Sequence, residues 1–276
     1  MTEADDLEEL PRDELIAIIR DLQERVRRAE IARPTTLPAE QPAAPPPAPD
    51  DSGEILGLTP LRQALAEHAV RSRREVPHGL AVVAVDMTEV AGLRERVRVK
   101  LEDREGVRLT YLPFVLKCAA EALRRYPLLA ARREDSGHVR LPEAFHISIP
   151  LRRDGRESVV VVVRDADTKS VVGLARDLMD LDRRAREDTL AERDLRGAVF
   201  TLTNPGALGA LIQPPTIALP QSAALALGHV TPDSERRQST VHLSLSYDLR
   251  VIDDETALLF LQEIRRSLEE TRFLFT

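Results

Sequence analysis

The alternation of apolar and polar positions predicts a mixed α/β body over residues 58–276. Apolar residues at helical spacing predict helices, and short apolar runs bounded by turn residues predict strands. The predicted helices are 59–74, 88–102, 111–125, 170–186 and 255–270, and the predicted strands are 79–87, 144–151, 158–163, 198–203, 223–229 and 241–247. Helices interleaved with this many strands indicate an α/β sandwich.

Two further segments precede this body. Residues 13–30 read as a helix whose apolar positions alternate by four and three, which is the spacing of a coiled-coil seam: Leu15, Ile19, Leu22, Val26 and Ala29. So short a helix associates weakly alone, so a solvated amphipathic helix and a docking or oligomerising helix both stay open. Seven of the 19 prolines fall within residues 34–49, which predicts an extended linker. The domains are therefore expected at 1–30 (acidic segment and helix), 31–57 (linker) and 58–276.

Charge and cysteine content exclude several classes of function. The 276 residues carry 39 Lys and Arg against 46 Asp and Glu, a balance of −7, and the first fourteen residues account for −6 of it. The body is nearly neutral and lacks a basic block, which excludes a nucleic acid as the main partner. Cys118 is the lone cysteine and is expected in the core, so we predict neither a disulfide nor a metal site. Without a signal peptide or spanning segment, we expect a cytoplasmic protein with no membrane partner.

A run of 36 residues, 197–232, contains no Asp, Glu, Lys or Arg, although such residues make up 31% of the chain. Charged residues are excluded mainly from buried surfaces. We therefore expect this run to be mostly buried, in the core or in a subunit contact.

Six motifs follow one another along the body: T-P-L-R at 59–62, V-P-H at 76–78, L-T-Y-L-P-F at 109–114, V-R-D-A-D at 163–167, F-T-L-T-N-P-G at 200–206 and L-S-L-S-Y-D at 243–248. In this order they resemble the catalytic domain of dihydrolipoyl acyltransferases, the core component of 2-oxo acid dehydrogenase complexes. The resemblance implies a two-layer sandwich of the chloramphenicol acetyltransferase-like type. It also implies trimers with active sites at subunit boundaries, and acyl transfer between dihydrolipoamide and coenzyme A.

The resemblance assigns roles to five positions. Thr203, followed by Asn204, would stabilise the oxyanion, and Asp253 would pair with Arg62 of the first helix. The general base is a histidine in the family motif D-H-R-x-x-D-G, but this chain has Leu249 there and Asp254 in place of the glycine. Leucine cannot take a proton from a thiol, and losing general-base assistance costs about 10²- to 10⁴-fold in rate.

Purely structural roles for Asp253 and Thr203, and a catalytic base at another position, both stay open. Asp253 and its acidic neighbours would equally cap the last helix, and Thr203 would be at home in any strand. The other histidines lack the motif spacing: His68, His78, His138, His146, His229 (with Asp233 four residues on) and His242.

The leading hypothesis is a catalytically degenerate homotrimeric core, a pseudoenzyme that acts as a scaffold and recruits a partner protein through its N-terminal helix. The rival is an active coenzyme A-dependent acyltransferase using Thr203 with an unidentified base or with a pre-ionised acceptor. Assembly with an active paralogue that supplies the histidine also stays open. The lysines are Lys100, Lys117 and Lys169, so we expect no lipoyl lysine and no covalent cofactor on this chain. Coenzyme A or an acyl-CoA would be a substrate. The apolar C-terminus, with Phe273 and Phe275, would dock on a neighbouring trimer in a larger assembly or fold back.

Overall fold

The structure is a computed structural model that describes residues 12–31, 56–134, 137–153, 156–233, 235 and 238–274. Its contacts divide the chain into two units, residues 1–56 and 57–276, and each is described by itself. The first unit contains helix α1 (Arg12–Ile31), close to the predicted bounds. Nearly all of the predicted linker lies outside the described residues.

The second unit contains every helix and strand predicted for it, and each predicted end lies within three residues of the observed one. The helices are α2 (Pro60–Glu75), α3 (Thr88–Glu105), α4 (Leu112–Arg125), α5 (Val171–Arg186) and α6 (Asp254–Glu269). The strands are β1 (His78–Asp86), β4 (Ile147–Arg153), β5 (Arg156–Val163), β6 (Phe200–Thr203), β7 (Ala223–Leu227) and β9 (Gln238–Asp248). Three short strands are additional: β2 (Arg132–Arg133), β3 (Val139–Arg140) and β8 (Thr231–Asp233).

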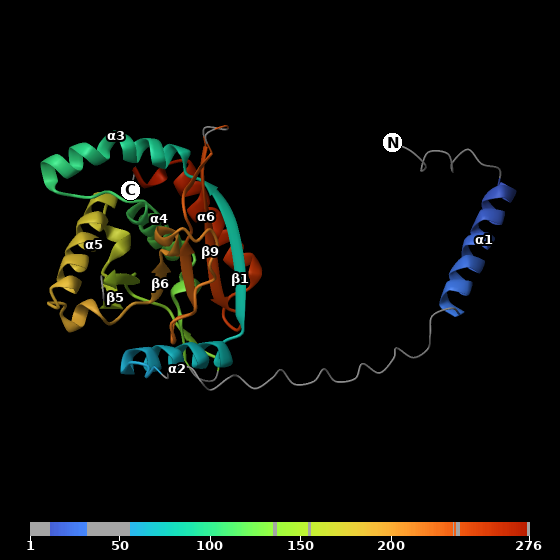
Figure 1. Ribbon diagram of the computed structural model, residues 1–276, viewed down its shortest axis with the longest axis horizontal. Coiled ribbons are helices and arrows are strands. Elements are labelled where there is room, and N and C mark those ends of the chain that lie inside the picture. Colours follow the sequence, from blue (N-terminus) through green and yellow to red (C-terminus); the bar gives the residue numbers. More distant parts are fainter. Residues whose placement is uncertain are drawn as a thin grey trace. The chain divides into compact units, whose positions relative to one another are not determined.

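One mixed sheet organises the second unit. Its strand order is β1-β9-β7-β6-β4-β5, with β8 beside β9. β6 is parallel to both β4 and β7, and the other neighbours are antiparallel. β4 and β5, which are consecutive in the chain, pair directly with each other, and residues 154–155 between them lie outside the described residues. β1 runs from the end where α2 lies to the end where α3 lies (Figure 1).

Helices α4, α5 and α6 form the second layer, against one face of the sheet (Figure 1). Because alternate side chains of a strand point to opposite faces, Phe200 reaches this core and stacks edge-on against Phe260 of α6 at 6.0 Å between ring centroids. Cys118 is fully buried there, as predicted, and burial raises the pKa of its thiol. The predicted two-layer α/β architecture is therefore confirmed.

The opposite face of the sheet carries small polar side chains. Ser148, Thr201, Ser244 and Ser246 all point to it and are buried. The loop before β7 is joined to α2, since the Ser72 hydroxyl donates to the carbonyl oxygen of Ile217 at 2.7 Å.

The charge-free run 197–232 is only partly buried within one chain. β6 and β7 lie in the core, whereas Leu208, Leu211 and Ile212 are 67%, 52% and 51% exposed. Core burial therefore explains only part of this composition, and the exposed remainder is the part for which we expected a subunit contact.

The C-terminal segment folds back at Phe273, which is buried and packs edge-on against Phe114 at 5.2 Å between centroids. Phe275 lies outside the described residues. Among the helices that the structure describes, none is both long and apolar enough to cross a membrane.

Candidate functional site

Thr203 lies at the end of β6 on the polar face of the sheet, half-buried. Its hydroxyl makes one long hydrogen bond, donating to the carbonyl oxygen of Leu225 at 3.4 Å. The neighbouring hydroxyls are held more firmly, because Ser148 and Thr201 lie 2.9 Å apart and Thr201 donates to Gln221 at 2.6 Å. A weakly bonded hydroxyl is the kind that can turn toward a ligand, so the geometry allows the role assigned to Thr203.

Asn204 stabilises the turn that follows Thr203. Its side-chain oxygen accepts from the backbone N–H of Ala207 at 3.2 Å and caps a short 3-10 helix, Pro205–Leu208. Gly206 packs directly on Gly228, since a Cβ at residue 206 would lie 2.1 Å from the Gly228 carbonyl oxygen. The turn after Thr203 is therefore fixed by close backbone packing.

Leu249, at the position assigned to the base, follows the last residue of β9 in a turn. Its side chain is 49% exposed and its N–H donates to the carbonyl oxygen of Pro77 at 3.0 Å. The preceding residue, Asp248, is buried. The following residue, Arg250, donates to both of its carboxylate oxygens, from Nε to Oδ1 at 2.8 Å and from Nη2 to Oδ2 at 2.6 Å. This bidentate contact raises the pKa of Arg250 and fixes the turn.

Asp253 caps α6, accepting a hydrogen bond from the backbone N–H of Thr256 at 2.7 Å. This interaction lowers the pKa of the Asp253 carboxyl. In the part of the chain that the structure describes, Asp253 contacts Thr256 and the Arg62 N–H is bonded to Thr59, and the expected ion pair between Asp253 and Arg62 is not present within the single chain. The simpler interpretation of Asp253 as a helix cap is confirmed.

Asp254, which stands at the motif glycine, accepts a hydrogen bond from the Tyr247 hydroxyl. Burial first, and then the hydrogen bond and charge of Asp254, raise the pKa of Tyr247 to about 12. The Tyr247 ring lies over Gly79, where a Cβ would be only 2.3 Å from a ring carbon. Asp254 is therefore held by a hydrogen bond to a tyrosine of β9.

The two halves of the assigned site are far apart within one chain. Thr203 is level with Ala226 of β7, which is level with Ser244 of β9, and Leu249 follows five residues later. With strands about 4.8 Å apart and a rise of about 3.3 Å per residue, Thr203 and Leu249 are separated by on the order of 20 Å. One chain does not bring these two positions together.

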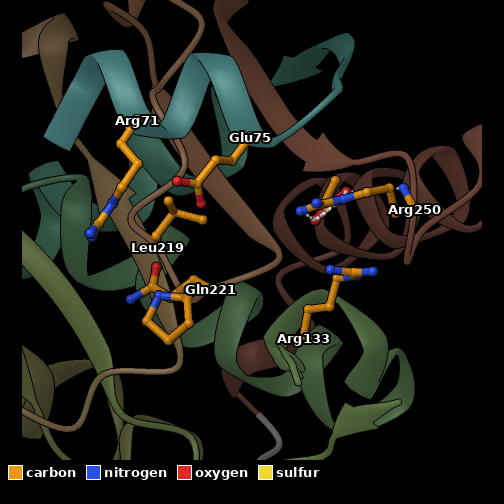
Figure 2. A pocket seen from close by; sticks show the side chains of 8 residues that line it. Arg71, Glu75, Arg133, Leu219, Gln221 and Arg250 are labelled. Carbon is orange, nitrogen blue, oxygen red and sulfur yellow. Dashed lines mark hydrogen bonds and ion pairs between the residues drawn. The ribbon is translucent and has the colours of Figure 1, made fainter. Parts of the chain in front are cut away.

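A cavity of about 270 Å³ opens beside the Leu249 turn (Figure 2). Arg71 and Glu75 project into it from α2 toward Leu219 and Gln221, while Arg133 and Arg250 lie on the opposite side. Four segments supply its lining: α2, the β2 strand, residues 219–221 and the end of β9. Of the lining residues, only Asp248 and Arg250 belong to the motifs of the sequence. No motif links segments so distant in the chain, so the cavity itself was not predicted.

Two histidines lie close to the assigned positions. His78 pairs with Asp248 across β1 and β9, and its Nδ1 is 2.7 Å from the carbonyl oxygen of Val76. Its Nε2 is buried without a hydrogen-bond partner in the described part of the chain. His229 follows β7, with its Nδ1 2.9 Å from the carbonyl oxygen of Gly206. His78 thus lies beside Leu249, and His229 lies beside the turn after Thr203.

Comparison with known proteins identifies the family. Residues 51–276 match the family model for the 2-oxoacid dehydrogenases acyltransferase (catalytic domain), and the chain belongs to this family. The dihydrolipoyllysine-residue acetyltransferase component of the Mycobacterium tuberculosis pyruvate dehydrogenase complex is 34% identical over 226 residues. The match covers 77% of this chain and 40% of that protein, so the chain spans less than half the length of this relative.

Solved structures of the same family have a similar fold. An Azotobacter vinelandii dihydrolipoamide acetyltransferase, studied for the catalytic roles of a serine, a histidine and an asparagine, has a TM-score of 0.75 at 28% identity, covering 84% of this chain and 100% of that one. The cubic core of a pyruvate dehydrogenase multienzyme complex has the same TM-score and coverages at 29% identity. The second unit of the chain is thus a 2-oxo acid dehydrogenase acyltransferase domain.

Proposed function

We propose that this acyltransferase domain is catalytically degenerate and acts as a trimeric core that scaffolds other proteins. The observation that carries the proposal is Leu249. In the Azotobacter vinelandii enzyme the histidine and asparagine that were investigated stand four positions apart, and Leu249 and Asp253 have the same separation. The side chain at the histidine position here is aliphatic, so it cannot serve as a general base.

The surroundings of Leu249 support the same proposal. Asp253 is used as a helix cap without an ion pair to Arg62, and Asp254 is used by Tyr247. The acidic groups near the lost base thus stabilise the fold. Coenzyme A or an acyl-CoA would be a substrate of any remaining activity, with the acyl group arriving from another molecule.

A trimeric core is supported by the separation of Thr203 from Leu249 and by the exposed apolar loop. A site that unites the two positions needs residues from two chains, and Leu208, Leu211 and Ile212 offer an apolar surface for such a contact. The single buried Cys118 fits a reducing cytoplasm.

Restoration of the base tests the proposal. We expect the natural protein to transfer no measurable acetyl group from acetyl-CoA to dihydrolipoamide. Leu249→His should gain activity, because it places an imidazole opposite Thr203 of a neighbouring chain. Turnover by the natural protein at an ordinary enzyme rate of about 1 to 10³ per second would contradict degeneracy.

The alternative function is an active acyltransferase with a relocated base. The observation that favours it is the buried, unpartnered Nε2 of His78, in the described part of the chain, beside Leu249. With Nδ1 turned to the Val76 carbonyl, Nε2 is the nitrogen left to accept a proton. If the natural protein is active, His78→Asn should abolish the rate, with His138→Asn as the matched control on an exposed residue. If both variants of an active protein keep the full rate, His78 is not the base.

A further inference from the structure

We infer that α1 pairs with α1 of a second copy as a parallel two-stranded coiled coil. The seam residues define a heptad register with Ile19 and Val26 at a and with Leu15, Leu22 and Ala29 at d. β-Branched residues at a combined with leucine at d favour two strands in parallel. The helix therefore carries the residue types of a dimer at its seam.

The seam is exposed in the single chain. Ile19, Leu22 and Val26 are 52%, 51% and 58% exposed, along one side of a helix of 20 residues. The rest of the helix surface carries charges instead, with weak ion pairs of 3.9 Å between Arg25, which flanks the seam, and Asp21, and of 3.8 Å between Arg28 and Glu24. Pairing would remove the apolar side from water and leave most of this charged face solvated.

Charge complementarity selects the second copy and its direction. Arg25 occupies a g position and Glu30 the e position of the following heptad. A parallel, in-register pair places each g side chain beside the e side chain five residues further along the other helix. Two symmetric Arg25–Glu30 contacts result. An antiparallel pair brings g toward g, and the other described g position is Ile18, which offers no charge.

The linker helps so short a helix to associate. Residues 32–55, which connect α1 to the acyltransferase domain, lie outside the described residues. Tethering several copies of α1 to one core raises their local concentration. Because a trimer carries three helices, pairs would leave one unmatched, and two trimers would join through three pairs. This joining rests on the proposed trimer, whereas the pairing itself does not.

Cysteine cross-linking in the full chain tests the direction of pairing. Val26→Cys places a thiol at an a position, and the natural Cys118 is fully buried and does not interfere. A parallel pair brings the two introduced thiols together, so oxidation should give covalent dimers. Arg27→Cys, on the outer face, is the matched control and should cross-link far less. Equal yields from both variants, or none from either, would overturn the pairing.

Charge reversal tests the partner. Arg25→Glu and Glu30→Arg should each weaken pairing roughly tenfold, since two attractive contacts become repulsive. Mixing the two variant chains should restore it, because the mixed pair regains both attractions. Arg27→Glu makes the same charge change on the outer face and should have no effect. If mixing fails to restore cross-linking between chains that both also carry Val26→Cys, helix self-pairing is wrong.

Particle mass separates this inference from the proposed trimer. We expect hexamers for the natural chain and trimers for Leu22→Asp. Dimers that become monomers with Leu22→Asp would support the pairing and contradict the trimer. A mass that Leu22→Asp leaves unchanged would overturn the pairing, because α1 would then be solvated, bound to another protein or bundled within one trimer.

Discussion

At the scale of single residues, the Tyr247–Asp254 contact joins strand β9 to the first residue of helix α6. Tyr247 is buried over Gly79 and donates to Asp254, so both its environment and its partner oppose ionisation. The same contact occupies Asp254, the residue that stands where the family has glycine. We therefore expect Asp254 to limit any activity gained by Leu249→His.

Tyr247 should titrate near pH 12 rather than near its ordinary value of 10. Asp254→Asn should lower this pKa part of the way, because burial remains when the charge is removed. The measurement is phenolate absorbance, with Tyr247→Phe as the control that removes the signal. Since the folded pKa is raised, the contribution to stability is complete below pH 10 and is lost as the pH rises toward 12. Titration of Tyr247 at its ordinary pKa would contradict the contact.

At the scale of elements, the Asp253 carboxylate at the start of α6 has two candidate roles, a helix cap and one half of an active-site ion pair. The family resemblance predicts that Asp253 pairs with Arg62, whereas the structure uses Asp253 to satisfy a free N–H of the first helical turn. Arg62 sits in the first turn of α2, where its own N–H is capped by Thr59 at 3.3 Å. The two helices are therefore capped independently.

A double-mutant cycle distinguishes a cap from an ion pair. We expect Asp253→Ala to lower the melting temperature, Asp253→Asn to preserve most of it because asparagine also caps, and Arg62→Ala to change little. The effects of Asp253→Ala and Arg62→Ala should add. Because the folded pKa of Asp253 is lowered from 3.8, its benefit should be present above that pH and be lost on further acidification. A large coupling between the two substitutions would instead indicate the ion pair.

At the scale of the whole molecule, the exposed part of the charge-free run predicts a subunit contact. Leu211 and Ile212 are half exposed on a loop without charged residues, which is unusual for a surface facing water. Val99 on α3 is 51% exposed but lies among charged neighbours. These two surfaces therefore provide a test and its control.

We predict that sedimentation equilibrium of the full chain gives masses that are multiples of three subunits. Leu211→Asp combined with Ile212→Asp should dissociate the trimer, because charges would be buried at its contact. Val99→Asp should leave the mass unchanged. A stable, folded monomer of the natural chain would show that the loop serves another purpose.

Much of the candidate site followed from local order in the chain. Thr203 was placed by its strand and motif, Asp253 by its position before an apolar-periodic helix, and Leu249 by the motif around it. The role of Asp253 as a helix cap could also be predicted from the sequence, because it depends only on the next three residues. The lack of a contact between Asp253 and Arg62 could not be predicted from the sequence, because it depends on how two helices remote in sequence approach each other.

The sequence by itself determined the order and type of the main elements, since hydrophobic periodicity is local and each segment carries its own pattern. It also determined that no proton acceptor stands at position 249. Only the tertiary structure decided that Thr203 and Leu249 are far apart in one chain, that His78 faces Asp248, and that the cavity beside Arg71 and Arg250 exists. These relations arise from strand pairing and packing between distant segments, which no local pattern encodes.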